Sequence, residues 1–134
     1  MTRSPWQARC GWPLLALCLA ALPGCRGGVP APADPGRGRE ALHAALDAWE
    51  KGETPESLRQ RTPPIYITDT DWLAGQRLVH YQLKDKDEYH GSQFRCWVVL
   101  SLQSDKGGRK EKTVSYLIDT QPALVIVRGD MFAR

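Results

Sequence analysis

A chain of 134 residues falls within the usual size of a single domain, about 100 to 200 residues. Its 18 Lys and Arg residues outnumber its 15 Asp and Glu residues, but Arg3 and Arg9 lie in a first segment with the composition of an export signal, and removing that segment leaves 16 basic against 15 acidic residues. The densest basic run, Arg109 to Lys112, contains Glu111 and lacks the clustered positive surface typical of nucleic-acid binding, so we expect no nucleic-acid partner.

Residues 1–24 have the organisation of a secretory signal. Two cations and no acid precede the apolar run from Trp12 to Leu22. Such a run matches the 7 to 15 apolar residues of a signal peptide and is shorter than the roughly 20 residues that a membrane-spanning helix needs. We therefore expect this segment to direct export and to take no part in the fold.

The sequence Leu22-Pro23-Gly24-Cys25 follows the apolar run directly and resembles the bacterial lipobox. The resemblance implies that the Cys25 thiol receives a diacylglycerol, that cleavage before Cys25 makes it the first residue, and that its new amino group is acylated too. In double-membrane bacteria, Arg26 after the cysteine implies delivery to the outer membrane. Two alternatives stay open, namely ordinary cleavage with an unmodified cysteine and an uncleaved anchor.

Residues 25–39 are rich in Gly, Pro, Ala and Arg, a composition that cannot bury a core and that predicts a flexible tether. We place a single folded domain at residues 40–130. Because Cys10 and Cys18 lie in the signal, Cys96 is the one cysteine of that domain, and an intramolecular disulfide is excluded. Cys96 lies in an alternating apolar strand, which predicts a buried, unreactive thiol.

The domain begins with an amphipathic helix from about Glu40 to Lys51. Its apolar residues recur at helical spacing, and Gly52 is a natural stop after the last turn. The residues of the apolar face are Leu42, Ala45, Leu46 and Trp49. Thr54 before Pro55 predicts a short second helical turn.

Extended segments follow Pro64. The clearest strand is Gln93 to Gln103, in which Phe94 and Cys96 begin the buried face and Arg95 and Trp97 begin the opposite face. A turn at Asp105 to Gly108 predicts a hairpin. The other expected segments are Ile65 to Ile67 as a brief strand, Asp69 to Asp71 as a loop or bulge, Arg77 to Leu83 as a strand with Val79, Tyr81 and Leu83 on one side, Lys84 to Glu88 as a charged loop, and strands at Lys112 to Ile118 and Ala123 to Val127.

These elements predict an α+β domain in which the first helix packs on a curved antiparallel meander of about four strands. The order of elements resembles the cystatin-like and nuclear transport factor two-like folds, in which a curved sheet wraps one or more helices. The resemblance extends over about 90 residues by element order alone, so no site residue is carried over. The chain is shorter at its helical end than the enzymes of that group.

Candidate site residues are few. Asp69 and Asp71 have a spacing that can contribute to Ca²⁺ binding, but the chain lacks the further acids and the glycine of such loops, and a turn with side-chain hydrogen bonds is favoured. The three histidines, His43, His80 and His90, have no metal-ligand spacing, so we expect no metal site and no cofactor.

The candidate ligand contacts are Trp97, Arg95 and His80, because an exposed Trp beside polar residues can anchor a peptide or glycan. The sequence thus favours a membrane-tethered envelope lipoprotein that faces the periplasm or the exterior and carries a small non-catalytic binding or structural domain, with the membrane and an envelope protein as expected partners. The alternative is a small hydrolase or isomerase that uses the cavity of a curved sheet, with His80, Tyr81 or Asp119 as titrating groups.

Overall fold

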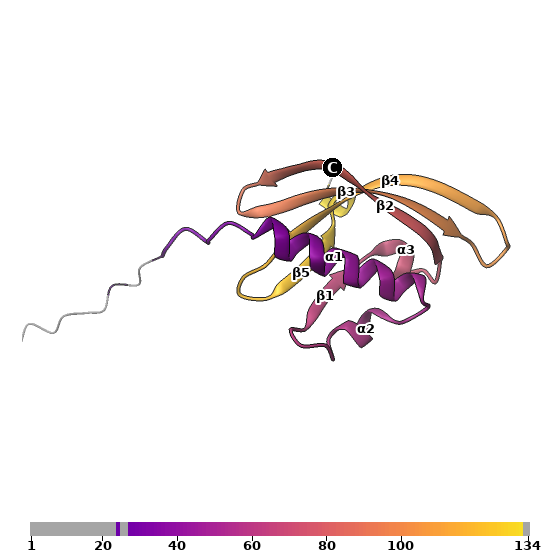
Figure 1. Cartoon of the computed structure of the whole chain (residues 1–134), viewed down its shortest axis with the longest axis horizontal. Coiled ribbons are helices and arrows are strands. Elements are labelled where there is room, and N and C mark those ends of the chain that lie inside the picture. Colours follow the sequence, from indigo (N-terminus) through magenta and orange to yellow (C-terminus); the bar gives the residue numbers. More distant parts are fainter. Residues whose placement is uncertain (1–23, 25–26, 133–134) are drawn as a thin grey trace, which may run out of the picture.

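The computed structural model of the protein describes residue 24 and residues 27–132, in which a long helix lies across one face of a five-stranded sheet (Figure 1). The expected α+β class is confirmed. The predicted signal up to residue 23 and the predicted lipidation site Cys25 lie outside the described residues. The elements in chain order are α1 Pro35–Glu50, α2 Pro55–Leu58, β1 Ile65–Thr68, α3 Thr70–Leu73, β2 Arg77–His90, β3 Gln93–Gln103, β4 Arg109–Asp119, β5 Leu124–Arg128 and the 3₁₀ turn η1 Gly129–Phe132.

Helix α1 begins at Pro35 and not at Glu40, so the end of the predicted tether belongs to the domain. The carboxylate of Asp34 caps the helix by accepting a hydrogen bond from the backbone N–H of Arg37 at 2.8 Å, and proline suits the first helical position. Gly38, which made the segment resemble a linker, lies where the helix approaches the sheet. A Cβ there would be 3.3 Å from Cγ2 of Ile118, which explains a glycine inside a helix.

The sheet has the strand order β1-β5-β4-β3-β2 and is mixed. Each consecutive pair of strands from β2 to β5 is antiparallel, whereas β1 lies parallel to β5 at the edge, with Ile65 opposite Leu124 and Thr68 opposite Val127. The expectation of an antiparallel meander of about four strands is therefore wrong for β1. Its pairing joins segments far apart in the chain, and local spacing carries no information about such a contact.

Strand β2 is longer than expected and its faces differ from the prediction. It continues to His90, so the charged segment Lys84 to Glu88 belongs to the strand and is not a loop, although a second register shift leaves Lys84 to Lys86 without a partner on β3. The register with β3 shifts between Leu78 and His80, which is typical of a bulge. As a result Leu78 lies on the same side as Tyr81, facing the helix, opposite Leu102 and Leu100. Tyr81 and Leu83 share this side as predicted, whereas the prediction that placed Leu78 on the other side is wrong.

The core lies between α1 and the helix-facing side of the sheet. The four apolar residues predicted for the helix face are all buried, and Cys96 on β3 is fully buried as predicted. Trp49 of α1 stacks on Trp72 of α3, with ring centroids 5.2 Å apart and planes 6° from parallel. The predicted hairpin turn is present, with Gly107 at a φ of 83° between β3 and β4.

Candidate functional site

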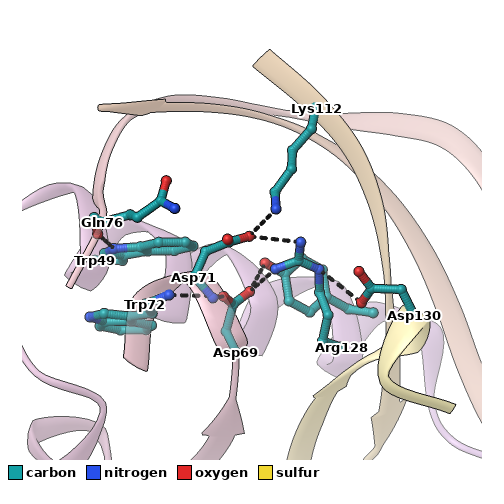
Figure 2. A network of polar contacts seen from close by, with 9 residues as sticks. Trp49, Asp69, Asp71, Trp72, Gln76, Lys112, Arg128 and Asp130 are labelled. Carbon is teal, nitrogen blue, oxygen red and sulfur yellow. Dashed lines mark hydrogen bonds and ion pairs between the residues drawn. The ribbon is translucent and has the colours of Figure 1, made fainter. Parts of the chain in front are cut away.

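The most concentrated polar cluster of the described residues lies inside the domain, where β1 leads into α3 (Figure 2). Asp69 is the N-cap of α3, and its Oδ1 accepts hydrogen bonds from the backbone N–H groups of Asp71 and Trp72 at 2.8 and 3.0 Å. These are the side-chain hydrogen bonds expected for this segment. The short helix then directs both carboxylates toward the sheet, with Asp69 1% and Asp71 8% exposed.

Arg128, the last residue of β5, binds both carboxylates with its guanidinium fork. Nη1 donates to Oδ2 of Asp69 and Nη2 donates to Oδ2 of Asp71, each at 2.8 Å. The Arg128 side chain has no solvent exposure, and its Nε lies 3.2 Å from Oδ1 of Asp130 in an ion pair without hydrogen-bond geometry. A two-pronged interaction of this kind is the arrangement in which arginine binds carboxylates most strongly.

Two residues of β4 complete the cluster. The hydroxyl of Tyr116 donates to Oδ2 of Asp69 at 2.6 Å, and Nζ of Lys112 lies 2.5 Å from Oδ2 of Asp71. We call Asp69, Asp71, Lys112, Tyr116 and Arg128 the ion-pair network. Lys112, at 28% exposure of its side chain, connects this network to the surface.

The pKa values in the network keep its members in their structural forms. Burial and the nearby charge of Asp69 raise the pKa of Tyr116 well above its ordinary value, so its hydroxyl stays protonated and donates. Burial would lower the pKa of Arg128, but Asp69 and Asp71 outweigh it and raise the pKa. The cluster therefore pairs its charges internally, and the unexposed side chains of Asp69 and Arg128 cannot contact a solute.

The three residues proposed as titrating groups are not brought together. His80 and Tyr81 lie near α1 in an open hollow of about 530 Å³, where the Tyr81 hydroxyl donates to Oδ1 of Asp47 at 2.6 Å and lies 3.0 Å from Nδ1 of His43. Burial and Asp47 raise the pKa of Tyr81, which keeps it protonated. Asp119 lies opposite Val125 at the far end of β4 and accepts a hydrogen bond from Gln93, the first residue of β3, at 2.9 Å. His80 pairs with Ser101, near the other end of β3.

Two of the candidate ligand contacts lie on the sheet face away from α1. Arg95 and Trp97 are half-buried there, while Phe94 and Cys96 face the helix, as the alternation predicts. Arg95 pairs with Glu88 at 3.3 Å, and Nζ of Lys86 lies over the Trp97 ring, 5.7 Å from its centroid. His80 is exposed at the other end of the pairing between β2 and β3. The structure therefore does not join the three candidates into one site.

Arg128 and Tyr116 were not predicted as site residues, because the sequence placed Arg128 just after the last expected strand, Ala123 to Val127, and Tyr116 inside the strand Lys112 to Ile118. One signal was present, since Leu124, Ile126 and Arg128 alternate on the same face of β5, and that face is buried. A charged residue such as Arg128 on a strand face that is otherwise apolar and buried indicates a buried partner of opposite charge.

Among the described residues, no three His, Cys, Asp or Glu side chains are grouped as metal ligands. The helices of that part of the chain are also too short or too polar to cross a membrane. Comparison of the chain with protein-family models, with curated proteins and with solved structures gives no match.

Proposed function

We propose that the protein is a bacterial envelope lipoprotein, anchored by fatty acids on Cys25, whose exported domain binds a ligand or partner without catalysing a reaction. The observation that carries the proposal is the sequence Leu22-Pro23-Gly24-Cys25 directly after a charged segment and a short apolar run. Multiple acyl chains on one terminus anchor a protein stably, since each buried CH₂ contributes about 0.8 kcal/mol.

The start of the folded domain fits this role. The backbone N–H of Ala33 donates to the carbonyl of Ser92 at 2.8 Å, so the domain holds the chain from this residue onward. Residues 26–32 remain between Cys25 and the domain, and at up to about 3.5 Å per residue they span at most roughly 25 Å. Such a tether holds a small domain close to the membrane surface, facing the periplasm or the exterior. With Arg26 after the cysteine, we propose the outer membrane in bacteria that have one.

The arrangement of titratable groups supports binding more than catalysis. A catalytic centre requires an acid, a base or a nucleophile converging on one reactive position. Here the strongest cluster consists of buried ion pairs, and His80 and Asp119 lie at opposite ends of the sheet. We also propose that the domain resembles the cystatin-like and nuclear transport factor two-like folds. The packing of α1 on one face of a sheet whose sequential strands are antiparallel supports this resemblance.

Growth of expressing bacteria on an alkyne-bearing fatty acid tests the anchor. Wild-type protein should take up the label, and Cys25→Ser should not, because the thiol is the acceptor in the lipobox. Cys96→Ala is the matched control, since it removes the thiol of the folded domain and should leave labelling unchanged. Equal labelling of wild type and Cys25→Ser would contradict the proposal.

A further inference from the structure

Strand β2 forms one edge of the sheet and pairs only with β3. Apart from that ladder, residues 77–90 make no backbone hydrogen bond within the part of the chain that the structure describes. An exposed row of backbone N–H and C=O groups is a template on which another extended chain can pair. The outer edge of β2 is therefore open to an additional strand.

Much of this edge carries features that discourage such pairing. Lys84 to Lys86 have no partner on β3, and the run of charged residues continues to Glu88; irregular register and charge both protect an edge. The register also shifts directly before His80. Between these irregularities, His80 to Leu83 pair regularly with β3 and include no Lys, Arg, Asp or Glu. This regular stretch is the part of the edge best suited to pairing.

The open hollow of about 530 Å³ beside α1 runs along the same stretch, because all four residues from His80 to Leu83 line it. Successive side chains of a strand point to opposite faces, so four consecutive residues can line one hollow only where it reaches the backbone edge between the faces. The opposite wall is formed by residues of successive turns of α1, namely Arg39, His43, Asp47 and Glu50. An extended peptide in such a groove gains affinity from main-chain hydrogen bonds and specificity from every second side chain.

The α1 wall of the groove carries negative charge that the domain does not neutralise. Asp47 accepts the Tyr81 hydroxyl but forms no ion pair, and Glu50 forms neither an ion pair nor a side-chain hydrogen bond among the described residues. Burial, Asp47 and Glu50 together raise the pKa of Tyr81, so both carboxylates act on the groove. Arg39 is already paired with two carboxylates of β2. Even with Lys51 at the end of α1 included, two cations stand against four carboxylates.

The other cations of β2 lie on the opposite face of the sheet. Arg77 pairs with Gln103, which alternation places on the face away from α1. Lys84 follows Leu83, whose side chain packs against the core, and Nζ of Lys86 lies over the Trp97 ring. The groove therefore remains negatively charged.

We infer that an extended peptide segment of a partner protein pairs with β2 at His80 to Leu83 and places basic side chains at Asp47 and Glu50. The inference rests on the proposed function, because it names the class of partner that the binding domain takes. Side chains three residues apart on a helix are about 5 to 6 Å from each other, and alternate side chains of an extended chain are about 6.6 Å apart. Two Lys or Arg residues at positions i and i+2 of the peptide therefore match the two carboxylates.

Fluorescence anisotropy of a labelled peptide with the sequence TVKVKVTS tests the inference. The full processed chain is purified in a non-ionic detergent, and detergent alone is the blank. We expect saturable binding, and TVEVEVTS should bind about tenfold more weakly or worse, since two attractions become repulsions. Asp47→Asn keeps the oxygen that accepts the Tyr81 hydroxyl, and it and Glu50→Gln should each weaken binding about threefold. Glu111→Gln, on the distant β4, is the matched control and should leave binding unchanged.

Methylation of the peptide backbone separates edge pairing from charge attraction. Successive N–H groups of a strand point to opposite edges, so methyl groups on the lysine backbone nitrogens block one edge of the peptide, and methyl groups on the valine nitrogens block the other. One of these two peptides should lose binding and the other should keep it. Amide hydrogen exchange of His80 to Leu83 should slow when TVKVKVTS is bound.

Four results would overturn the inference: no binding of TVKVKVTS, equal binding of the lysine and glutamate peptides, equal affinity of the two methylated peptides, or wild-type affinity in Asp47→Asn combined with Glu50→Gln. A chain that cross-links to itself through β2 and binds no peptide would assign the edge to a second copy and also overturn it. The mass of the amino-terminal peptide of the same preparation reports separately whether Cys25 is acylated, so failure of the anchor and failure of the peptide site are distinguishable.

Discussion

Replacement of Arg128 by Met tests whether the ion-pair network stabilises the domain. Methionine retains an unbranched apolar side chain but has no guanidinium, so the unexposed carboxylate of Asp69 keeps the hydrogen bonds from Tyr116 and from the backbone but loses its cation and the hydrogen bond from Arg128. Removing one partner of a buried ion pair costs about 3 to 5 kcal/mol, which is a large share of the roughly 5 to 15 kcal/mol that keeps a domain folded. We expect Arg128→Met to lower the free energy of unfolding by about 4 kcal/mol.

Urea unfolding of the exported chain, followed by tryptophan fluorescence, measures this loss because the Trp49 and Trp72 stack lies beside the network. Arg128→Lys keeps the charge without the fork, so its loss should be intermediate. The double variant Asp69→Asn with Arg128→Met should be more stable than Arg128→Met alone, since the carboxylate left without a cation is gone. Arg109→Met, at the exposed start of β4, is the control and should stay within about 0.5 kcal/mol of wild type.

The same variant has a defined pH dependence. Burial alone would raise the pKa of Asp71, but hydrogen bonds from Lys112 and Arg128 outweigh burial and hold the pKa below its ordinary value of 3.8. A carboxyl with a lowered folded-state pKa stabilises the fold above the unfolded pKa, and this contribution disappears as the pH falls through the folded pKa. Wild type should therefore lose more stability than Arg128→Met below about pH 4. A loss below about 1 kcal/mol at neutral pH, or parallel acid profiles, would refute this account of the network.

Two more predictions concern the core. Leu46→Asp and Trp49→Asp should each unfold the domain or lower its melting temperature severely, because each places an unpaired charge on the buried face of α1, and unchanged melting curves would show that the face does not pack on the sheet. In the native chain a thiol reagent should modify Cys96 slowly until denaturant is added, since burial raises the pKa of its thiol to about 12, and Cys96→Ala should cost about 1 kcal/mol. Rapid labelling of the native domain would contradict the burial of Cys96.

The parts of the fold that the sequence predicted are those with short-range periodicity. The face of α1 that carries Leu46 and Trp49 recurs at helical spacing, and the burial of β3 alternates at every residue from Gln93 to Gln103. Both patterns arise because each element buries one continuous face, so they can be read without knowledge of the partner. The start of α1 could not be predicted in this way. Gly38 is explained by the close packing of the helix on Ile118, and Ile118 lies on a strand that is distant in sequence.

The candidate site was predicted less well because its contacts are distant in sequence. Arg128 lies 59 and 57 positions from Asp69 and Asp71, and the pair of aspartates alone indicated only a turn. Local hydrogen bonds of Asp69 were expected and are present, whereas the buried arginine was not. Strand β2 shows the same limit, since the register shift after Leu78 places Leu78 on the same side as Tyr81, whereas strict alternation separates them.

The position of the ion-pair network explains how a short parallel strand is held at the edge of the sheet. Strand β1 has four residues and pairs only with β5, and so short a parallel ladder is weak by itself. The last backbone pair joins Thr68 to Val127. Asp69 follows Thr68 in the chain, and Arg128 follows Val127. The ion pair between the side chains of Asp69 and Arg128 therefore joins the two segments directly after the last backbone pair. A shift of β1 by one residue would separate the two charges inside the core, so the buried pair fixes the register of β1 on β5.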